Sequence, residues 1–111
     1  MTTASSPVRV YRLDTFLVPV HSRDEFMSKV KAINAVLKDQ PGFFQDFLFE
    51  RASGHESTQV VTLVEWESAE AMGWARVAVT QLHNASGFKP AEMLSRLGIT
   101  ANFETYTGVD T

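Results

Sequence analysis

Apolar and polar residues alternate along the chain in blocks that predict four strands, two long helices and one short helix. The first block, residues 8–18, reads VRVYRLDTFLV and is rich in the β-branched and aromatic residues that strands favour. Pro19 lacks the backbone donor that a continuing strand needs, so we expect the strand to stop there. Residues 1–7 are small and polar, and we expect a disordered tail.

A helix is predicted directly after this strand. Ser22 and Glu25 have the spacing of a capping box, in which each side chain bonds to the backbone of the other residue. Lys29, Lys31 and Lys38 are expected to lie largely off the apolar face of this helix. The residues of that face recur at spacings of four, three and four: Phe26, Val30, Ile33 and Leu37.

Pro41 and Gly42 end the helix, because both residue types break helical structure. An aromatic-rich strand, a polar turn and a third strand follow, and Ser68 is placed to cap the second helix. Pro90 opens a short helix, and Gly98 is placed to end it. The expected ranges of these elements are 43–51, 59–67, 69–84, 90–97 and, for the last strand, 100–107. The expected core face of the second helix holds Met72, Ala75, Val79 and Leu82.

This order of elements predicts an α+β fold. Strand, helix, strand, strand, helix, strand is the ferredoxin-like βαββαβ pattern, in which helices cover one face of a four-stranded antiparallel sheet. A chain of 111 residues is short enough to form a single domain, which we expect to span residues 8–109.

The expected sheet is apolar on both faces, which points to a partner. Strict alternation in the second strand puts Phe43, Phe47 and Phe49 on one face and Phe44 and Leu48 on the other. The third strand also carries apolar residues at both odd and even positions. Two helices cover only one face, so we predict a homodimer in which the other faces meet. The alternative is that loops and the short helix fold over the open face.

Composition and charge exclude several classes of function. With 44% apolar and 21% charged residues, the chain is typical of globular proteins, and it has no apolar run long enough to cross a membrane. Its ten basic residues are scattered among thirteen acidic ones, so no basic cluster is available for nucleic acid. The absence of cysteine excludes disulfides and thiolate sites, and it suits a reducing cytoplasm.

The sequence contains no recognised cofactor-binding or metal-binding motif. There is no glycine-rich loop for phosphate or dinucleotide binding. The three histidines, His21, His55 and His83, lack the spacing of metal ligands on a helix. We therefore expect a protein that works without a cofactor or a metal, and whose partner is a small apolar or aromatic molecule.

The third strand and its exit carry a family resemblance. The segment VVTLVEWESAEAM, residues 60–72, and the triplet Pro41-Gly42-Phe43 resemble the antibiotic biosynthesis monooxygenase family, and the order of elements agrees. The resemblance implies a dimeric α+β barrel. Within that family, some members oxidise anthrones or polycyclic phenols to quinones with dioxygen and no cofactor, some degrade haem, and some isomerise quinones. The fold alone does not choose among these reactions.

Two residues of the third strand correspond to site positions of the quinone-forming relatives. The Trp at the strand end matches Trp66, which in those relatives lies in the substrate cavity. An Asn on the same face of that strand falls at Thr62 here, so a hydroxyl replaces a carboxamide. The haem-degrading branch has a His on the second helix where this sequence has Arg76, and an Asn on a first strand that lacks one here, so haem degradation is not expected.

We take Trp66 and His83 as the catalytic candidates. Trp66 could stack on a flat aromatic substrate, or it could be a core aromatic. His83 falls beside the expected core face of the second helix and could accept a phenolic proton near neutral pH. Alternatively, it is a helix-end residue, because the helix dipole stabilises a positively charged His in the last turn.

The candidate substrate-binding residues lie mostly on strands. Tyr11, Asp14 and Tyr106 are on strands whose open face could line a cavity, and Thr62 and Met72 adjoin the Trp66 position. Arg12 shares a strand face with Asp14, so the pair could bind or deprotonate a phenol. Alternatively both charges are solvated at a sheet edge.

The sequence leaves three functions open. The first is a cofactor-independent monooxygenase that oxidises an electron-rich aromatic or polyketide-like substrate. The second is a non-catalytic dimeric module that binds a small molecule. The third is an isomerase or cyclase acting in the same pocket.

Overall fold

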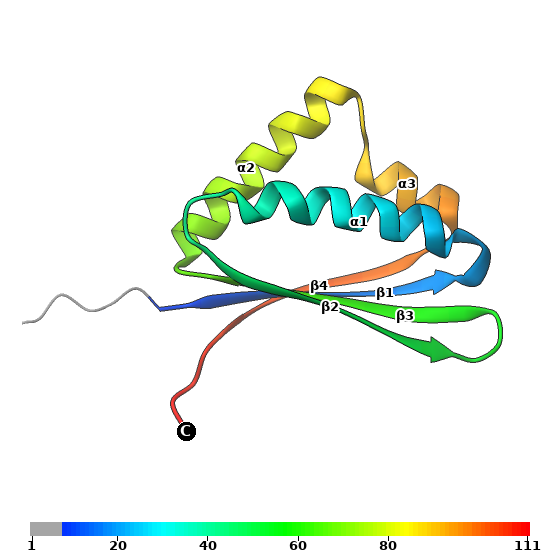
Figure 1. The fold of residues 1–111 in the computed structure, drawn as a ribbon, viewed down its shortest axis with the longest axis horizontal. Helices are drawn as coiled ribbons and strands as arrows, with labels where there is room; N and C mark the ends of the chain where they lie inside the picture. Colours follow the sequence, from blue (N-terminus) through cyan, green and yellow to red (C-terminus); the bar gives the residue numbers. More distant parts are fainter. Residues whose placement is uncertain (1–7) are drawn as a thin grey trace, which may run out of the picture.

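The computed structural model describes residues 8–111 and confirms the ferredoxin-like α+β fold. Residues 1–7, expected to form a tail, lie outside the described residues. The elements run in the order β1 (Val10–Pro19), a 3₁₀ turn (Val20–Ser22), α1 (Arg23–Lys38), β2 (Phe43–Ser53), β3 (Ser57–Trp66), α2 (Ala69–Ser86), α3 (Pro90–Leu97) and β4 (Thr100–Thr107). The three helices lie on one face of a single sheet (Figure 1).

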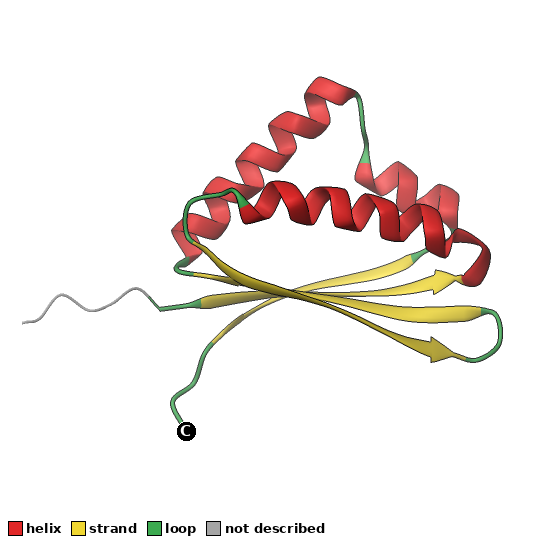
Figure 2. Ribbon diagram, viewed as in Figure 1, coloured by secondary structure: helices red, strands yellow, loops and turns green. Residues whose placement is uncertain are grey.

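The sheet has the strand order β2-β3-β1-β4, and every neighbouring pair is antiparallel. Its strands twist across one another beneath the helical layer (Figure 2). Because α3 packs on the same side as α1 and α2, the short helix does not cover the opposite face. We call the two sides the helix face and the open face.

A β-bulge in β2 changes which aromatic residues face the helices. The pairing with β3 shifts by one residue between Phe43 and Gln45. As a result Phe43 lies on the helix face beside Trp66, whereas Phe47 and Phe49 lie on the open face, where their rings stack 5.8 Å apart. The expectation that Phe43, Phe47 and Phe49 share one face was therefore wrong, because strict alternation does not hold across a bulge.

Ser22 begins α1 but does not form the expected capping box. Its hydroxyl donates instead to the carbonyl oxygen of Leu97 at 2.9 Å, which ties the start of α1 to the end of α3. The predictions for the start of α2 and the end of α3 are confirmed. The Ser68 side chain accepts a hydrogen bond from the backbone nitrogen of Ala71, and Gly98 ends α3 in the left-handed conformation with a φ of 71°.

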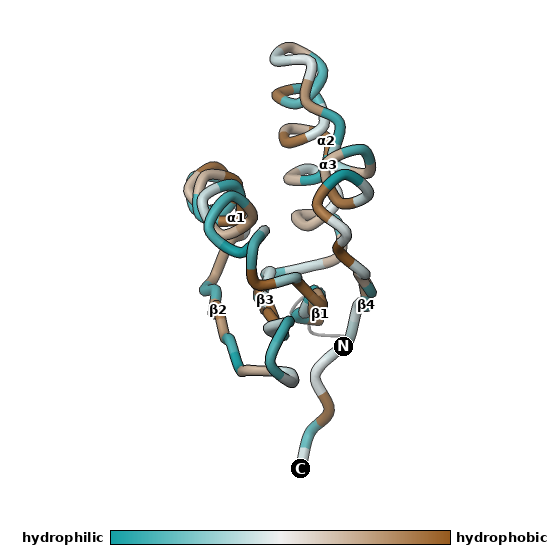
Figure 3. Tube along the Cα trace, turned by 90° about the vertical axis from the view of Figure 1, so that its right-hand side faces the viewer, coloured by the Kyte–Doolittle hydropathy of each residue, from teal (hydrophilic) through white to brown (hydrophobic). Residues whose placement is uncertain are grey.

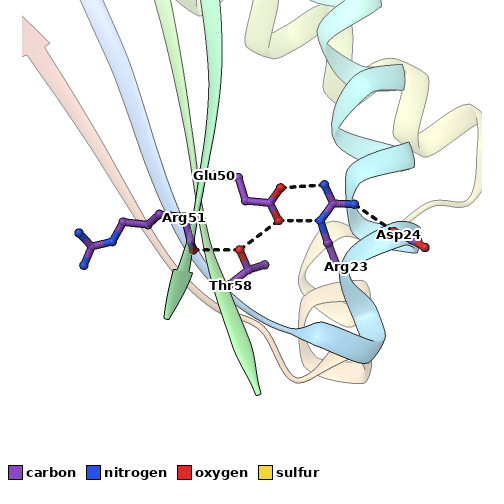
Figure 4. Close-up of polar contacts among 5 residues, drawn as sticks. All are labelled: Arg23, Asp24, Glu50, Arg51 and Thr58. Carbon is purple, nitrogen blue, oxygen red and sulfur yellow. Dashed lines mark hydrogen bonds and ion pairs between the residues drawn. The ribbon is translucent and has the colours of Figure 1, made fainter. Parts of the chain in front are cut away.

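An ion pair joins the first turn of α1 to β2. The Arg23 guanidinium donates two hydrogen bonds to the Glu50 carboxylate, at 2.6 and 2.7 Å, and a third to Asp24 (Figure 4). The Thr58 hydroxyl lies 3.0 Å from Glu50 and 2.9 Å from the carbonyl oxygen of Arg51. This network holds the start of α1 close to the turn end of the β2-β3 hairpin.

The hydrophobic core consists of two separate clusters between helices and sheet. The larger cluster joins β1 and β3 to α1 and the end of α3, and it includes Phe16, Val18, Phe26 and Val60. The smaller cluster joins the other ends of β1 and β3 to the start of α2: Val10, Val64, Trp66, Ala71 and Ala75. Viewed along the strands, α1 stands apart from α2 and α3 above the sheet (Figure 3).

Candidate active site

A cavity of about 390 Å³ lies between the two core clusters, bounded by the three helices and the helix face of the sheet. Its walls include members of both clusters, such as Phe26 and Trp66, and also the exposed residue Phe103, so the cavity is partly open to solvent. The volume falls in the range of pockets that bind small organic molecules. Most of the wall is apolar, with a few charged and polar side chains.

Trp66, Thr62 and Met72 form the wall at the start of α2. Trp66 ends β3 and is 2% exposed, and its ring meets the Phe43 ring edge to face at 5.8 Å. Thr62 lies on the same face of β3 and is also buried. Because Ser68 starts α2 two residues after Trp66, Met72 comes to lie against the same cavity. The Trp66 indole thus forms part of this wall.

An ion pair lies in the floor of the cavity. The Arg12 Nε atom donates to the Asp14 Oδ1 atom at 2.6 Å, and both side chains are partly buried. Burial raises the pKa of Asp14, and the hydrogen bond and charge of Arg12 oppose that rise. The Arg12 guanidinium also lies 5.2 Å from the centre of the Phe103 ring. The floor therefore presents a neutralised pair rather than an isolated carboxylate.

His83 reaches the cavity from the last part of α2. Its ring packs against Phe88 at 4.8 Å, and the Lys29 ammonium lies 3.7 Å from the centre of the same Phe88 ring. Burial lowers the pKa of His83, and the nearby charge of Lys29 lowers it further. A neutral imidazole at physiological pH can accept a proton from a bound molecule.

The structure brings together most of the site residues predicted from the sequence. Asp14, Thr62, Trp66, Met72 and His83 all line this one cavity. It does not bring Tyr11 and Tyr106 there. These two residues pair with each other across β1 and β4 on the open face, where the Tyr11 hydroxyl donates to Glu65 at 3.3 Å.

Two charged residues of the cavity wall were not singled out as site residues from the sequence. Lys29 was expected to lie off the apolar face of α1, yet it lines the cavity. Arg76 lines it from α2. The sequence contained a signal for the position of Lys29. It is three residues after Phe26 and four before Ile33, and residues at these spacings lie on one helix face. Conversely Leu82, expected in the core, is half exposed.

Within residues 8–111, no group of three or more His, Asp or Glu side chains is arranged to hold a metal ion. No helix in this part of the chain has the length and apolar character needed to cross a membrane.

The family model described as antibiotic biosynthesis monooxygenase matches residues 11–88, about two thirds of the chain. The chain belongs to the antibiotic biosynthesis monooxygenase family. The matched segment contains the cavity residues of β1, β3, α1 and α2, from Arg12 to His83. No curated protein sequence matches this family member.

Solved structures of low sequence identity share the fold of this antibiotic biosynthesis monooxygenase family member over nearly its whole length. A protein from Shewanella loihica PV-4 is 18% identical, with a TM-score of 0.70, and the match covers 96% of this chain and all of that one. SnoaB, a cofactor-independent oxygenase from Streptomyces nogalater, is 21% identical, with a TM-score of 0.66 and coverage of 94% and 96%. Rv0793 from Mycobacterium tuberculosis is 15% identical, with a TM-score of 0.65 and coverage of 93% and 97%.

Proposed function

We propose that this protein is a cofactor-independent monooxygenase that oxidises an electron-rich aromatic or polyketide-like molecule with dioxygen. The observation that carries the proposal is that Trp66 and His83 line one cavity of about 390 Å³. This combination offers a stacking surface and a neutral base in a largely apolar cavity. Family membership and the similarity in fold to the oxygenase SnoaB support the same class.

In the proposed reaction the substrate supplies the electrons. His83 accepts a proton from an activated methylene group, and the resulting carbanion reduces dioxygen and forms a carbon–oxygen bond. The peroxide anion that results takes the proton back from His83 and loses water to leave a carbonyl group, so that CH₂ and O₂ become C=O and H₂O. The protein's part is to orient the ring against Trp66, to hold the proton at His83 and to exclude bulk water. Asp14, Thr62 and Met72 shape the cavity around the ring.

We propose that the working form is a homodimer that joins two open faces. Four large apolar side chains on this face are 43–52% exposed in the single chain: Leu17, Phe47, Phe49 and Tyr106. An apolar surface of this kind is unusual for a monomer. Tyr11 and Tyr106 would then belong to the subunit interface rather than to the substrate site. The absence of cysteine fits the cytoplasm as the proposed location.

Oxygen uptake by the purified, metal-free protein tests the proposal, with a panel of anthrones and polycyclic hydroquinones as substrates. We expect Trp66→Phe to lower kcat/KM for the best substrate by about tenfold, through lost stacking and orientation. His83→Gln should lower it by about 100-fold, which is the usual contribution of a general base.

Matched variants outside the cavity control for indirect effects. Trp74 is exposed on α2, and His55 lies exposed in the β2-β3 turn. Trp74→Phe and His55→Gln should leave oxygen uptake unchanged. Uptake that is equally fast in the His83→Gln variant would remove His83 from the mechanism.

The replacement of the relatives' Asn by Thr62 favours a second candidate, a non-catalytic module that binds a small molecule. Binding of an anthrone without oxygen uptake or product formation would support that function. Product formation under nitrogen would support an isomerase or cyclase instead.

A further inference from the structure

The charges around the cavity differ in sign from the charge of the whole protein. The chain carries a net charge of −3, with thirteen acidic and ten basic residues. The cavity wall nevertheless contains three basic side chains, Arg12, Lys29 and Arg76, and a single carboxylate, that of Asp14. A pocket lined mainly by one sign of charge concentrates ligands of the opposite sign.

Only one of these basic groups is neutralised. Arg12 is paired with Asp14 at 2.6 Å. In the part of the chain that the structure describes, neither Lys29 nor Arg76 takes part in an ion pair. The partner of Lys29 is the Phe88 ring, which holds the ammonium in place but leaves its full charge. Two positive charges of the wall are therefore available to a ligand.

There is space for an anionic group beside Lys29. A smaller cavity of about 170 Å³ lies between α1 and α2 and shares Lys29, Ile33, Val79 and His83 with the larger one. Lys29 thus borders two hollow regions. Trp66 belongs to the larger cavity alone.

We infer that the ligand of this cavity is an aromatic molecule that carries an anionic substituent such as a carboxylate, with Lys29 and Arg76 as the residues that select for the charge. The ring occupies the larger cavity against Trp66, and the anionic group lies toward Lys29. The inference rests on the proposed binding of an aromatic molecule in this cavity, and it does not depend on the oxidation of that molecule.

Direct binding tests the inference without relying on catalysis. Calorimetry or ligand fluorescence compares anthracene-2-carboxylate with its neutral carboxamide, at low ionic strength because salt screens such charges. We expect the native protein to bind the carboxylate about tenfold more tightly, which corresponds to about 1.4 kcal/mol. In the double variant Lys29→Met/Arg76→Met this preference should disappear, while the affinity for the carboxamide stays within about twofold of the native value.

The double variant Lys31→Met/Lys38→Met is the matched control, because it removes the same charge from exposed positions of α1. It should keep the preference for the carboxylate. Equal binding of the two ligands by the native protein, failure of the carboxylate to bind, or a preference that survives Lys29→Met/Arg76→Met would overturn the inference. A carboxylate preference in a protein that consumes no oxygen with any substrate would support the inference and count against the monooxygenase function.

Discussion

His83 shows how neighbouring residues set the chemistry of a single side chain. Its imidazole packs against Phe88 in a partly buried position, and Lys29 from α1 contacts the same ring. Both burial and the positive charge disfavour the imidazolium form, so the pKa of His83 lies below its usual value. The proposed base is therefore neutral at physiological pH without a carboxylate to orient it.

We predict that replacing Lys29 changes this pKa. Lys29→Met removes a positive charge that disfavours protonation, so the pKa of His83 should rise toward the ordinary histidine range. NMR titration of the imidazole Cε1 proton measures this change directly. The acidic limb of the oxygen-uptake profile should move to higher pH by the same amount, since uptake falls as His83 becomes protonated.

Lys31→Met is the control for this prediction, because Lys31 is exposed on the same helix. It should leave the His83 titration where it is in the native protein. A His83 pKa that stays the same or falls in Lys29→Met would contradict the assigned electrostatics.

At the scale of elements, the turn between α1 and β2 fixes the position of the Trp66 wall. Gly42 has a φ of 82°, and its carbonyl accepts a hydrogen bond from the Glu67 backbone nitrogen at 2.8 Å, next to Trp66. A Cβ atom at Gly42 would collide with the Cβ atom of Ala71 in the first turn of α2. The turn therefore needs glycine both for its backbone conformation and for close packing against α2.

Comparing Gly42→Ala with Gly54→Ala separates these two requirements. Gly54 also has a positive φ, 72°, but a Cβ atom there meets nothing within 4 Å. We expect Gly54→Ala to cost about 1 kcal/mol in the free energy of unfolding, through backbone strain alone. Gly42→Ala should cost roughly 2–4 kcal/mol, because the collision adds to that strain. Chemical denaturation measures both, and equal losses would show that the contact with α2 has no effect.

The elements were predictable from the sequence where local signals decide the structure. The range of β4, the cap at Ser68 and the end of α3 at Gly98 were predicted correctly, since strand propensity and end signals act within a few residues. The role of Ser22 was not, because its partner Leu97 is distant in sequence. The position of Lys29 was missed because a charged residue was assumed to face solvent, although its stem can line an apolar wall.

The residues of the candidate site were likewise predictable where the period of a strand or helix decides which way a side chain points. Asp14, Thr62 and Trp66 share the helix face by the two-residue period of strands, and Met72 and His83 follow from their positions on α2. Tyr11 and Tyr106 were included because the sequence did not establish which face of the sheet bounds the cavity. The helices decide this, and their side of the sheet depends on tertiary packing.

At the scale of the whole molecule, the two faces of the sheet carry different features. The helix face carries the core clusters and the cavity, and the open face presents exposed aromatic residues, including the stacked rings of Phe47 and Phe49. Joining two open faces would cover these rings and leave both cavities on the outer sides of the sheets.

We expect the native protein to elute as a dimer, and Phe47→Glu/Phe49→Glu to weaken the dimer by roughly 100-fold or more through loss of two exposed aromatic side chains of the open face in each subunit. Size-exclusion chromatography with light scattering across a dilution series measures this. Trp74→Glu is the control, because it places the same charge on an exposed aromatic position of α2. A monomeric native protein, or a dimer that Trp74→Glu disrupts instead, would rule out the open face as the interface.

The bulge between Phe43 and Gln45 has a consequence for comparing members of the family. One extra residue interrupts the alternation of the strand. Every later position of β2 therefore faces the side opposite to the one that strict alternation from Phe43 would give it. A relative that lacks this residue would carry its outward-facing aromatic residues one position earlier in the strand, counted from the residue equivalent to Phe43. If an alignment places this single-residue gap elsewhere in β2, it matches helix-face positions of one protein with open-face positions of the other, for every residue between the bulge and the gap. Residues 43–45 are therefore the structurally correct place for such a gap.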